Sequence, residues 1–171
     1  MRIGVAVGHA GAPFSESLEL ARAAEAAGLD AICAGDANVE AFTAAAALAT
    51  VTSRATIVTG IATWTRTPVT TAHAAKTVAN ISGGRYRLGL GPMPKAWSEE
   101  WHQVSYARPV ERMRDYVGAI RAALAASPAA PATHAGDFYG FSEFTGKPMV
   151  PEHDVPIDLA ATRPKMTELA G

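Results

Sequence analysis

Hydrophobic positions along the chain alternate between short, nearly continuous apolar runs and longer stretches in which apolar residues recur every three or four positions. The short runs are typical of strands buried on both faces, and the longer stretches are typical of helices that cover a sheet. The runs predict strands at residues 2–7, 29–35, 55–60, 86–90 and 156–160. The longer stretches predict helices at residues 15–27, 39–51, 68–81 and 109–125, and one more helix that begins at Pro164.

Small and polar residues mark where these elements begin and end. Gly83 and Gly84 supply the left-handed conformation that closes a helix at low cost, and the strand at 86–90 follows directly. Ser15 and Asn38 are typical N-cap residues, so they predict the starts of the first two helices.

The order of the elements predicts an α/β protein, a parallel (β/α) barrel of the TIM type with about four and a half β/α units present. Because a whole barrel takes ~250 residues, we expect residues 1–171 to form a single partial domain, half to two-thirds of a barrel. The alternative is a small doubly wound sheet, which is disfavoured because no glycine-rich dinucleotide loop follows the first strand. An open half-barrel exposes two strand edges, so we expect a homo-oligomer or a partner chain that completes the barrel.

Composition narrows the classes of function. The formal net charge is −1, with Lys and Arg scattered along the chain, so we expect no nucleic-acid partner. No apolar run is long enough to span a membrane or to form a signal peptide, and we expect a cytoplasmic protein. The one cysteine, Cys33, lies in mid-strand, which favours a buried apolar role over a nucleophile. The spacing of His102, His134 and His153 does not suit metal ligation, so we expect no metal site.

Six segments, in order along nearly the whole chain, resemble the bacterial luciferase-like monooxygenase superfamily. The segments are Ala26–Ile32, Gly35–Asp36, Thr59–Ile61, Ser82–Gly91, Arg112–Tyr116 and Pro156–Met166. Members of this family are oxidoreductases and monooxygenases that use flavin or the deazaflavin coenzyme F-420. The resemblance implies a (β/α)8 barrel, in agreement with the order of elements, and FMN or coenzyme F-420 as the cofactor.

The resemblance also implies that the cofactor ring lies at the C-terminal mouth of the barrel. In relatives a cis peptide bond that does not precede proline often backs the ring, and here it corresponds to Gly60–Ile61; the alternative is an ordinary glycine turn. The cofactor-binding residues implied on this side are Asp36, Gly60, Ile61, Ala62 and Thr63.

Two residues are candidates for catalysis, His9 and Asp36. Asp36 matches the position of an aspartate near the ring in deazaflavin enzymes, and its alternative role is that of a helix-cap or loop residue. Several relatives have a histidine at the next position, but this chain has Ala37, whose methyl group cannot transfer a proton. His9 ends the first strand and titrates near neutrality, which suits proton transfer; the alternative is a structural or exposed histidine.

The resemblance places the cofactor phosphate at the loop after the last predicted strand, which corresponds to Ala161, Thr162 and Arg163. A hydroxyl donor and a guanidinium would stabilise a phosphate there, although relatives often have glycine in place of Arg163. The alternative is an ordinary helix start with a surface arginine. Trp64, Trp97 and Trp101 follow the third and fourth predicted strands, where they either line a substrate pocket or pack the loops together.

The sequence thus favours a luciferase-like oxidoreductase or monooxygenase domain that uses reduced flavin or coenzyme F-420 on a small organic substrate. Between the two cofactors, Asp36, Gly60–Ile61 and the Pro164-Lys165-Met166 helix start favour the deazaflavin. The alternative is a non-catalytic half-barrel, or a fragment of a longer enzyme, that acts by association with another chain. Three features support this alternative. Ala37 cannot transfer a proton, the further strands of a whole barrel are not among the 171 residues, and the phosphate site is therefore incomplete.

Overall fold

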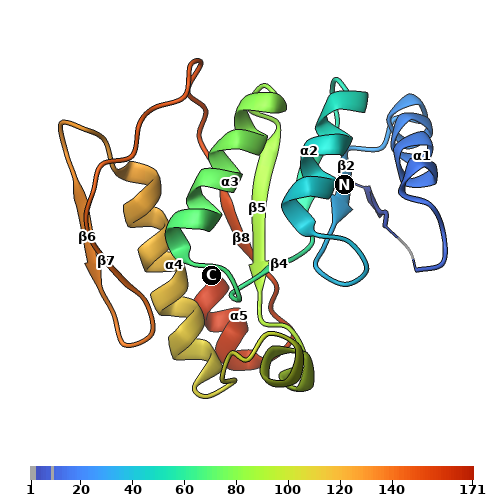
Figure 1. Ribbon diagram of the computed structural model, residues 1–171. Coiled ribbons are helices and arrows are strands. Elements are labelled where there is room, and N and C mark those ends of the chain that lie inside the picture. Colours follow the sequence, from blue (N-terminus) through green and yellow to red (C-terminus); the bar gives the residue numbers. More distant parts are fainter. Residues whose placement is uncertain (1–2, 9) are drawn as a thin grey trace. The chain divides into compact units, whose positions relative to one another are not determined.

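The computed structural model describes residues 3–8 and 10–171, which form alternating strands and helices (Figure 1). The strands of the main sheet are β1 (Gly4–Ala6), β2 (Ala31–Ala34), β3 (Thr56–Thr59), β4 (Ala62–Thr63), β5 (Tyr86–Gly91) and β8 (Ile157–Leu159). Their order is β1-β2-β3-β5-β4, and β8 also pairs with β5. The pairs β1–β2, β2–β3 and β3–β5 are parallel, with Ile32 opposite Ile57. The predicted parallel arrangement is therefore confirmed for these pairs.

The helices lie close to their predicted positions. They are α1 (Phe14–Ala26), α2 (Ala41–Val51), α3 (Pro68–Ile81), α4 (Pro109–Ala125) and α5 (Pro164–Ala170). The bounds of α4 are those predicted, because its apolar stripe has a clear helical period and Pro109 suits the first turn.

The predicted caps of the first two helices were wrong. Pro13 in an extended conformation precedes α1, and no side chain caps this helix. The residue that caps α2 is Glu40, whose carboxylate accepts a hydrogen bond from the Thr43 amide at 2.7 Å. Asn38 lies before this cap and its side-chain amide contacts the Gly8 carbonyl oxygen at 3.5 Å. A glutamate was not predicted because shorter side chains are the usual caps.

Contacts divide the chain into two compact units. The first unit contains Met1–Ala62, Ala75–Leu90 and Pro151–Asp158; the second contains Thr63–Ala74, Gly91–Val150 and Leu159–Gly171. The candidate residues for a cofactor are thus distributed over both units, and each unit is described by itself.

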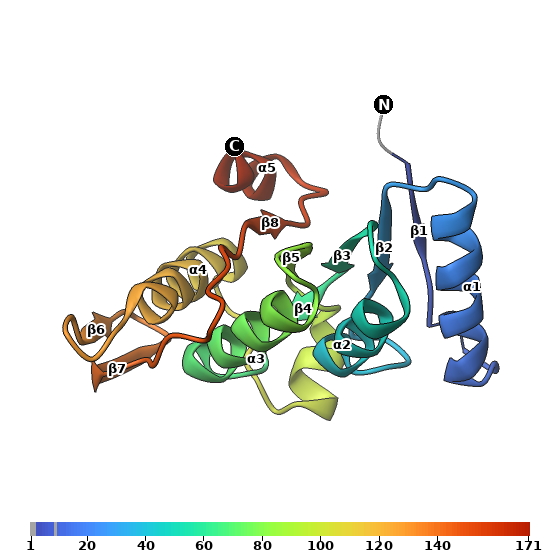
Figure 2. The same cartoon turned by 90° about the horizontal axis from the view of Figure 1, so that it is seen from above.

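In the first unit, α1 and α2 lie on the same side of β1, β2 and β3 (Figure 2). Ile32 and Ile57 are fully buried in this layer. The alternate strand residues, Cys33 and Val58 among them, are only partly buried. Because successive strand residues point to opposite faces, one face of this sheet is covered by helices and the other is half open. Among the described residues the sheet does not close into a barrel.

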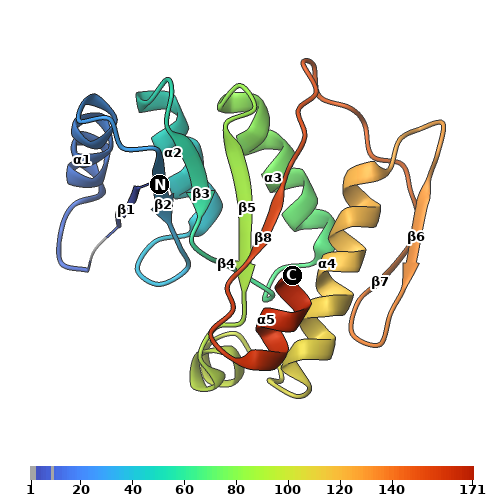
Figure 3. The same cartoon turned by 180° about the vertical axis from the view of Figure 1, so that it is seen from behind.

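The second unit is built around α4. Met113, Tyr116 and Ile120 of the predicted apolar stripe are fully buried. Strands β6 (Ala132–Ala135) and β7 (Gly140–Phe144) pair as an antiparallel hairpin, which we call the β6–β7 hairpin, and β6 packs against α4 (Figure 3). The sequence predicted only a turn with short strands or loop in this region. It also gave no sign of the π-helix η1 (Trp97–Trp101), which follows β5.

Candidate functional site

The carboxyl ends of β2 and β3 meet in the first unit around the peptide bond between Gly60 and Ile61. This bond is cis, as the sequence predicted. The Asp36 amide donates a hydrogen bond to the Ile61 carbonyl oxygen at 2.9 Å, and the Gly60 amide donates to the Ala34 carbonyl oxygen at 2.9 Å. These two bonds hold the end of β2 against the segment that follows β3.

Two glycines bring these backbones together. A Cβ atom added to Gly35 would lie 2.5 Å from both the Gly60 carbonyl carbon and the Ile61 nitrogen, which no real structure tolerates. Gly60 is itself exposed, and it offers bare backbone at the strand ends without a side chain to keep a ligand away. Cys33 lies beside it, and burial raises the pKa of the Cys33 thiol above its usual value, which favours the protonated thiol over the thiolate.

Asp36 has a defined structural role at this point. Its Oδ1 atom accepts a hydrogen bond at 2.9 Å from the amide of Ala41, which is the first residue of α2. The helix-cap role that the sequence left open for Asp36 is therefore present in the structure. This contact fixes the carboxylate at the end of β2, and Ala37 follows it as an exposed residue. His9, the other catalytic candidate, lies outside the described residues.

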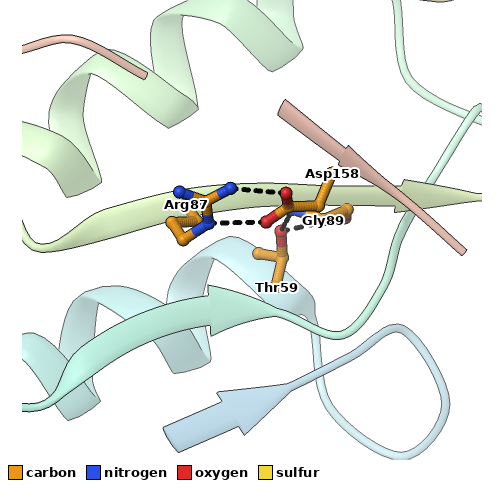
Figure 4. A network of polar contacts seen from close by, with 4 residues as sticks. All are labelled: Thr59, Arg87, Gly89 and Asp158. Atoms are coloured by element: carbon orange, nitrogen blue, oxygen red, sulfur yellow. Dashed lines mark hydrogen bonds and ion pairs between the residues drawn. The ribbon is translucent and has the colours of Figure 1, made fainter. Parts of the chain in front are cut away.

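Beneath the strand ends, β3 and β5 are joined by polar contacts of Thr59 (Figure 4). The Thr59 hydroxyl accepts from the Gly89 amide at 2.9 Å and donates to the Gly89 carbonyl oxygen at 3.0 Å. Since its single proton is used there, the Tyr86 hydroxyl, 3.1 Å away, is the donor in their contact. The strands can approach this closely because Gly89 has no side chain.

Arg87 and Asp158 form an ion pair across β5 and β8 (Figure 4). Arg87 donates from Nε at 2.7 Å and from one terminal nitrogen at 2.6 Å, a two-pronged geometry that fixes both side chains. The hydrogen bonds to Asp158 raise the pKa of Arg87 above its ordinary value. The side chains are 41% and 44% exposed, so this pair is a polar feature of the half-open sheet face.

The second unit has a pocket of about 480 Å³ beside the start of α5. Its walls include apolar side chains such as Tyr106, Val110 and Met166. Thr162, Arg163 and Lys165 also line it, and they bring a hydroxyl and two positive charges to an otherwise apolar site. This composition suits a ligand that has both an anionic group and an apolar part. The sequence singled out Thr162 and Arg163 but not Lys165.

The three tryptophans are in different environments. Trp64 is 1% exposed, and its indole N–H donates to the Ser98 hydroxyl at 3.4 Å, so it belongs to the core of the second unit. Trp97 and Trp101 stack with ring centroids 4.6 Å apart, and Trp101 is 61% exposed. Of the three, only the stacked pair thus offers aromatic surface to a ligand.

Ala62 and Thr63 are buried, with exposed fractions of 0% and 1%. The Thr63 hydroxyl lies 2.9 Å from the Thr65 hydroxyl. Within the described residues, no group of three or more His, Cys, Asp or Glu side chains is arranged to hold a metal ion. None of the helices described has both the length and the apolar character needed to cross a membrane.

Comparison with known proteins identifies the family. Residues 1–171 match the family model described as luciferase-like monooxygenase. The chain belongs to the luciferase-like monooxygenase family. Its resemblance in six short segments therefore reflects a relationship over its whole length.

This luciferase-like chain is similar in sequence to two oxidoreductases. It is 34% identical to a protein of Mycobacterium tuberculosis provisionally named a coenzyme F-420-dependent oxidoreductase, over 99% of the chain and 52% of that protein. It is 32% identical to 5,10-methylenetetrahydromethanopterin reductase of Methanolobus tindarius, over 93% of the chain and 48% of that protein. The chain thus spans about half the length of the relatives it matches.

The fold is that of solved luciferase-like structures. The coenzyme F-420-dependent tetrahydromethanopterin reductase of Methanopyrus kandleri superposes with a TM-score of 0.80 at 22% identity, over 98% of this chain and 52% of that one. This likeness confirms the predicted fold class, part of a parallel (β/α) barrel.

The luciferase-like chain has functional candidates that the sequence did not reveal. Gly35, Thr59 and Lys165 acquire a role only through neighbours distant in sequence, and Arg87 and Asp158 are 71 residues apart. One signal was available for Gly35, because a glycine directly before an aspartate at a strand end often marks a close approach of two backbones.

Proposed function

We propose that this chain supplies the cofactor-binding part of an oxidoreductase, with coenzyme F-420 or FMN as the cofactor and a small organic molecule as the substrate. The observation that carries the proposal is the bare backbone at Gly60, packed on Gly35 at the ends of β3 and β2. A flat ring can approach such a surface closely because no side chain covers it. These residues fit a flavin or deazaflavin ring.

The chain's residues have distinct proposed roles. When bound, the cofactor supplies hydride transfer or, as a reduced flavin, oxygen activation. Asp36, Gly60 and Ile61 are proposed to contact and orient the ring, while Ala62 and Thr63, which are buried, would support the chain that follows them. Ala37 offers no proton, so His9 is the proposed residue for proton transfer, with Asp36 as the second candidate.

In the second unit, the pocket beside α5 is proposed to bind an anionic group such as the cofactor phosphate. Thr162 would donate a hydrogen bond there, and Arg163 and Lys165 would neutralise the charge. Ala161 would contribute backbone. The stacked Trp97 and Trp101 are the proposed contacts for an apolar substrate.

Of the two cofactors, coenzyme F-420 is favoured. A relative that is 34% identical over 99% of this chain is named as a coenzyme F-420-dependent oxidoreductase. Asp36, Gly60–Ile61 and the helix start at Pro164 agree with this choice. FMN is the second candidate, because the family as a whole is described as monooxygenases.

A second function is a non-catalytic half-barrel that acts by association with another chain. One observation favours it: Ala37 stands where several relatives have a histidine. In this case Trp64, Trp97 and Trp101 would only pack loops.

A fluorescence titration of the purified chain with coenzyme F-420, FMN and riboflavin tests the proposal. We expect saturable, one-to-one binding of coenzyme F-420 or FMN, and weaker binding of riboflavin, which lacks the phosphate. Replacing Arg163→Glu should weaken binding about tenfold or more, because it reverses a charge that faces the anion. The matched control is Lys147→Glu, an exposed site outside the pocket. Absence of binding by folded protein would favour association instead.

A further inference from the structure

The Tyr139 side chain of the β6–β7 hairpin bonds to the segment after β4. The Tyr139 hydroxyl donates a hydrogen bond to the Trp64 carbonyl oxygen at 2.9 Å. Trp64 is buried, so its carbonyl group needs a donor from the protein. Trp64 directly follows Thr63, the last of the candidate ring contacts.

The hairpin is itself anchored to α4 by Asp115. One carboxylate oxygen pairs with Nε2 of His134 at 2.6 Å, and the other accepts from the amides of Phe138 and Tyr139 at 2.7 and 3.1 Å. Gly136 lies so close that any side chain there would overlap the Asp115 carboxylate. Although burial opposes ionisation, the hydrogen bonds from His134 and these amides lower the pKa of Asp115 below its usual value. The carboxylate therefore stays charged and holds the backbone of Tyr139.

The ring of Tyr139 lies against two residues of α4, Tyr116 and Arg112. It packs on Tyr116, with ring centroids 4.8 Å apart. The Arg112 guanidinium lies 5.7 Å from the Tyr139 ring, 5.9 Å from the Trp64 ring and 4.6 Å from the Phe138 ring. Cation–π attraction thus joins the hairpin to the Trp64 side chain.

The Tyr139 hydroxyl keeps its proton and can therefore donate a hydrogen bond. Burial raises the pKa of Tyr139 above its ordinary value, although Arg112 acts in the opposite direction. The group remains protonated at physiological pH. Its direction is set by the anchored backbone and by the packed ring.

We propose that Tyr139 is a positioning residue, whose hydroxyl holds the segment 64–67 and thereby fixes the chain directly after the proposed ring contacts. The inference deepens the proposed function and rests on it for the cofactor part. The role of the hydroxyl in holding the segment can be measured without any cofactor.

The test uses Tyr139→Phe in the full chain, with Tyr116→Phe as the matched control. Tyr116 is also a buried tyrosine of the second unit, and its hydroxyl bonds to the Thr71 hydroxyl at 2.6 Å. Hydrogen exchange of the amides of residues 64–67 is measured by mass spectrometry without cofactor, and the Kd and absorption spectrum of the bound cofactor are measured by titration. Tyr139→Phe removes the hydrogen bond to Trp64 and the longer one, 3.4 Å, that the hydroxyl accepts from Arg112. Because the bond to Trp64 is the one that reaches residues 64–67, its loss should speed their exchange and raise the Kd about tenfold. The control should change neither.

Unchanged exchange of residues 64–67 in folded Tyr139→Phe would overturn the inference. So would equal changes in both variants, since a merely structural role would produce them. If the wild type binds no cofactor, the proposed function fails, and the exchange data still decide whether Tyr139 holds the segment. If Tyr139→Phe does not fold, Asp115→Asn loosens the hairpin anchor and should give the same changes, smaller in size.

Discussion

At the scale of single residues, the candidate ring site depends on the absence of a side chain at Gly35. We expect Gly35→Ala to destabilise the protein by about 1–3 kcal/mol, the usual cost of overpacking. The added methyl would lie 2.5 Å from the Gly60 carbonyl carbon and from the Ile61 nitrogen, so the ends of β2 and β3 must separate. The same change should abolish cofactor binding. Urea denaturation and a cofactor titration measure the two effects.

The control for Gly35→Ala is Gly118→Ala. Gly118 lies within α4, where an added methyl meets only the His134 ring, at 3.4 Å. Alanine is the better helix former, so this variant should keep or slightly raise the stability. If Gly35→Ala kept the wild-type stability and affinity, the close approach of the two backbones would have no role in the site.

Residue-scale predictions from the sequence succeeded where the family pattern named a position. The cis bond at Gly60–Ile61 is such a case. The ion pair of Arg87 and Asp158 could not be predicted, because its members are 71 residues apart and only the pairing of β5 with β8 brings them together. Lys165 was missed for a related reason: the pocket that it lines is completed by residues from distant segments, Tyr106 and Val110 among them.

At the scale of elements, Glu25 joins the end of α1 to the chain entering β3. Its carboxylate accepts hydrogen bonds from the amides of Ser53, Arg54 and Ala55 at 2.7–3.0 Å. Burial raises the pKa of Glu25, but these hydrogen bonds outweigh it and lower the pKa to about 2. A folded pKa below the unfolded value of 4.5 means that the ionised carboxylate stabilises the fold above pH 4.5.

We therefore expect Glu25→Gln to lower the free energy of unfolding at pH 7 by about 1–2 kcal/mol, discounted for partial exposure of the carboxylate. The deficit should shrink as the pH falls from 4.5 towards 2, because the wild type loses this stabilisation as its carboxylate is protonated. Urea denaturation at pH 7, 4 and 3 follows the change. Glu19→Gln, an exposed site on the same helix, is the control. A deficit that does not depend on pH would contradict the role of the charge.

Elements were predictable where their pattern was local. The apolar stripe of α4 and the glycines after α3 carry their own signal, and both were located well. The π-helix η1 has no such period, and its Trp97–Trp101 stack forms only once the chain is wound. The β6–β7 hairpin is short, and its geometry depends on Asp115 of another element, so the sequence could show only a turn.

At the scale of the whole molecule, the half-open face of the main sheet makes association the expected behaviour. In the first unit, Cys33, Thr56 and Val58 are only partly buried, whereas Ile32 and Ile57 of the opposite face are fully buried. Apolar strand surface in water favours a partner that covers it.

We expect the 171-residue chain to be a dimer or a larger assembly in light scattering. Val58→Asp should shift it towards monomer, because association would then remove a new carboxylate on the half-open face from water. Ser15→Asp adds the same charge at an exposed position of α1 and should leave the assembly unchanged. Circular dichroism confirms that each variant is folded. A stable wild-type monomer would contradict the expectation. Equal loss of assembly in both variants would instead indicate an effect of net charge. The half-open sheet face would then not be the interface.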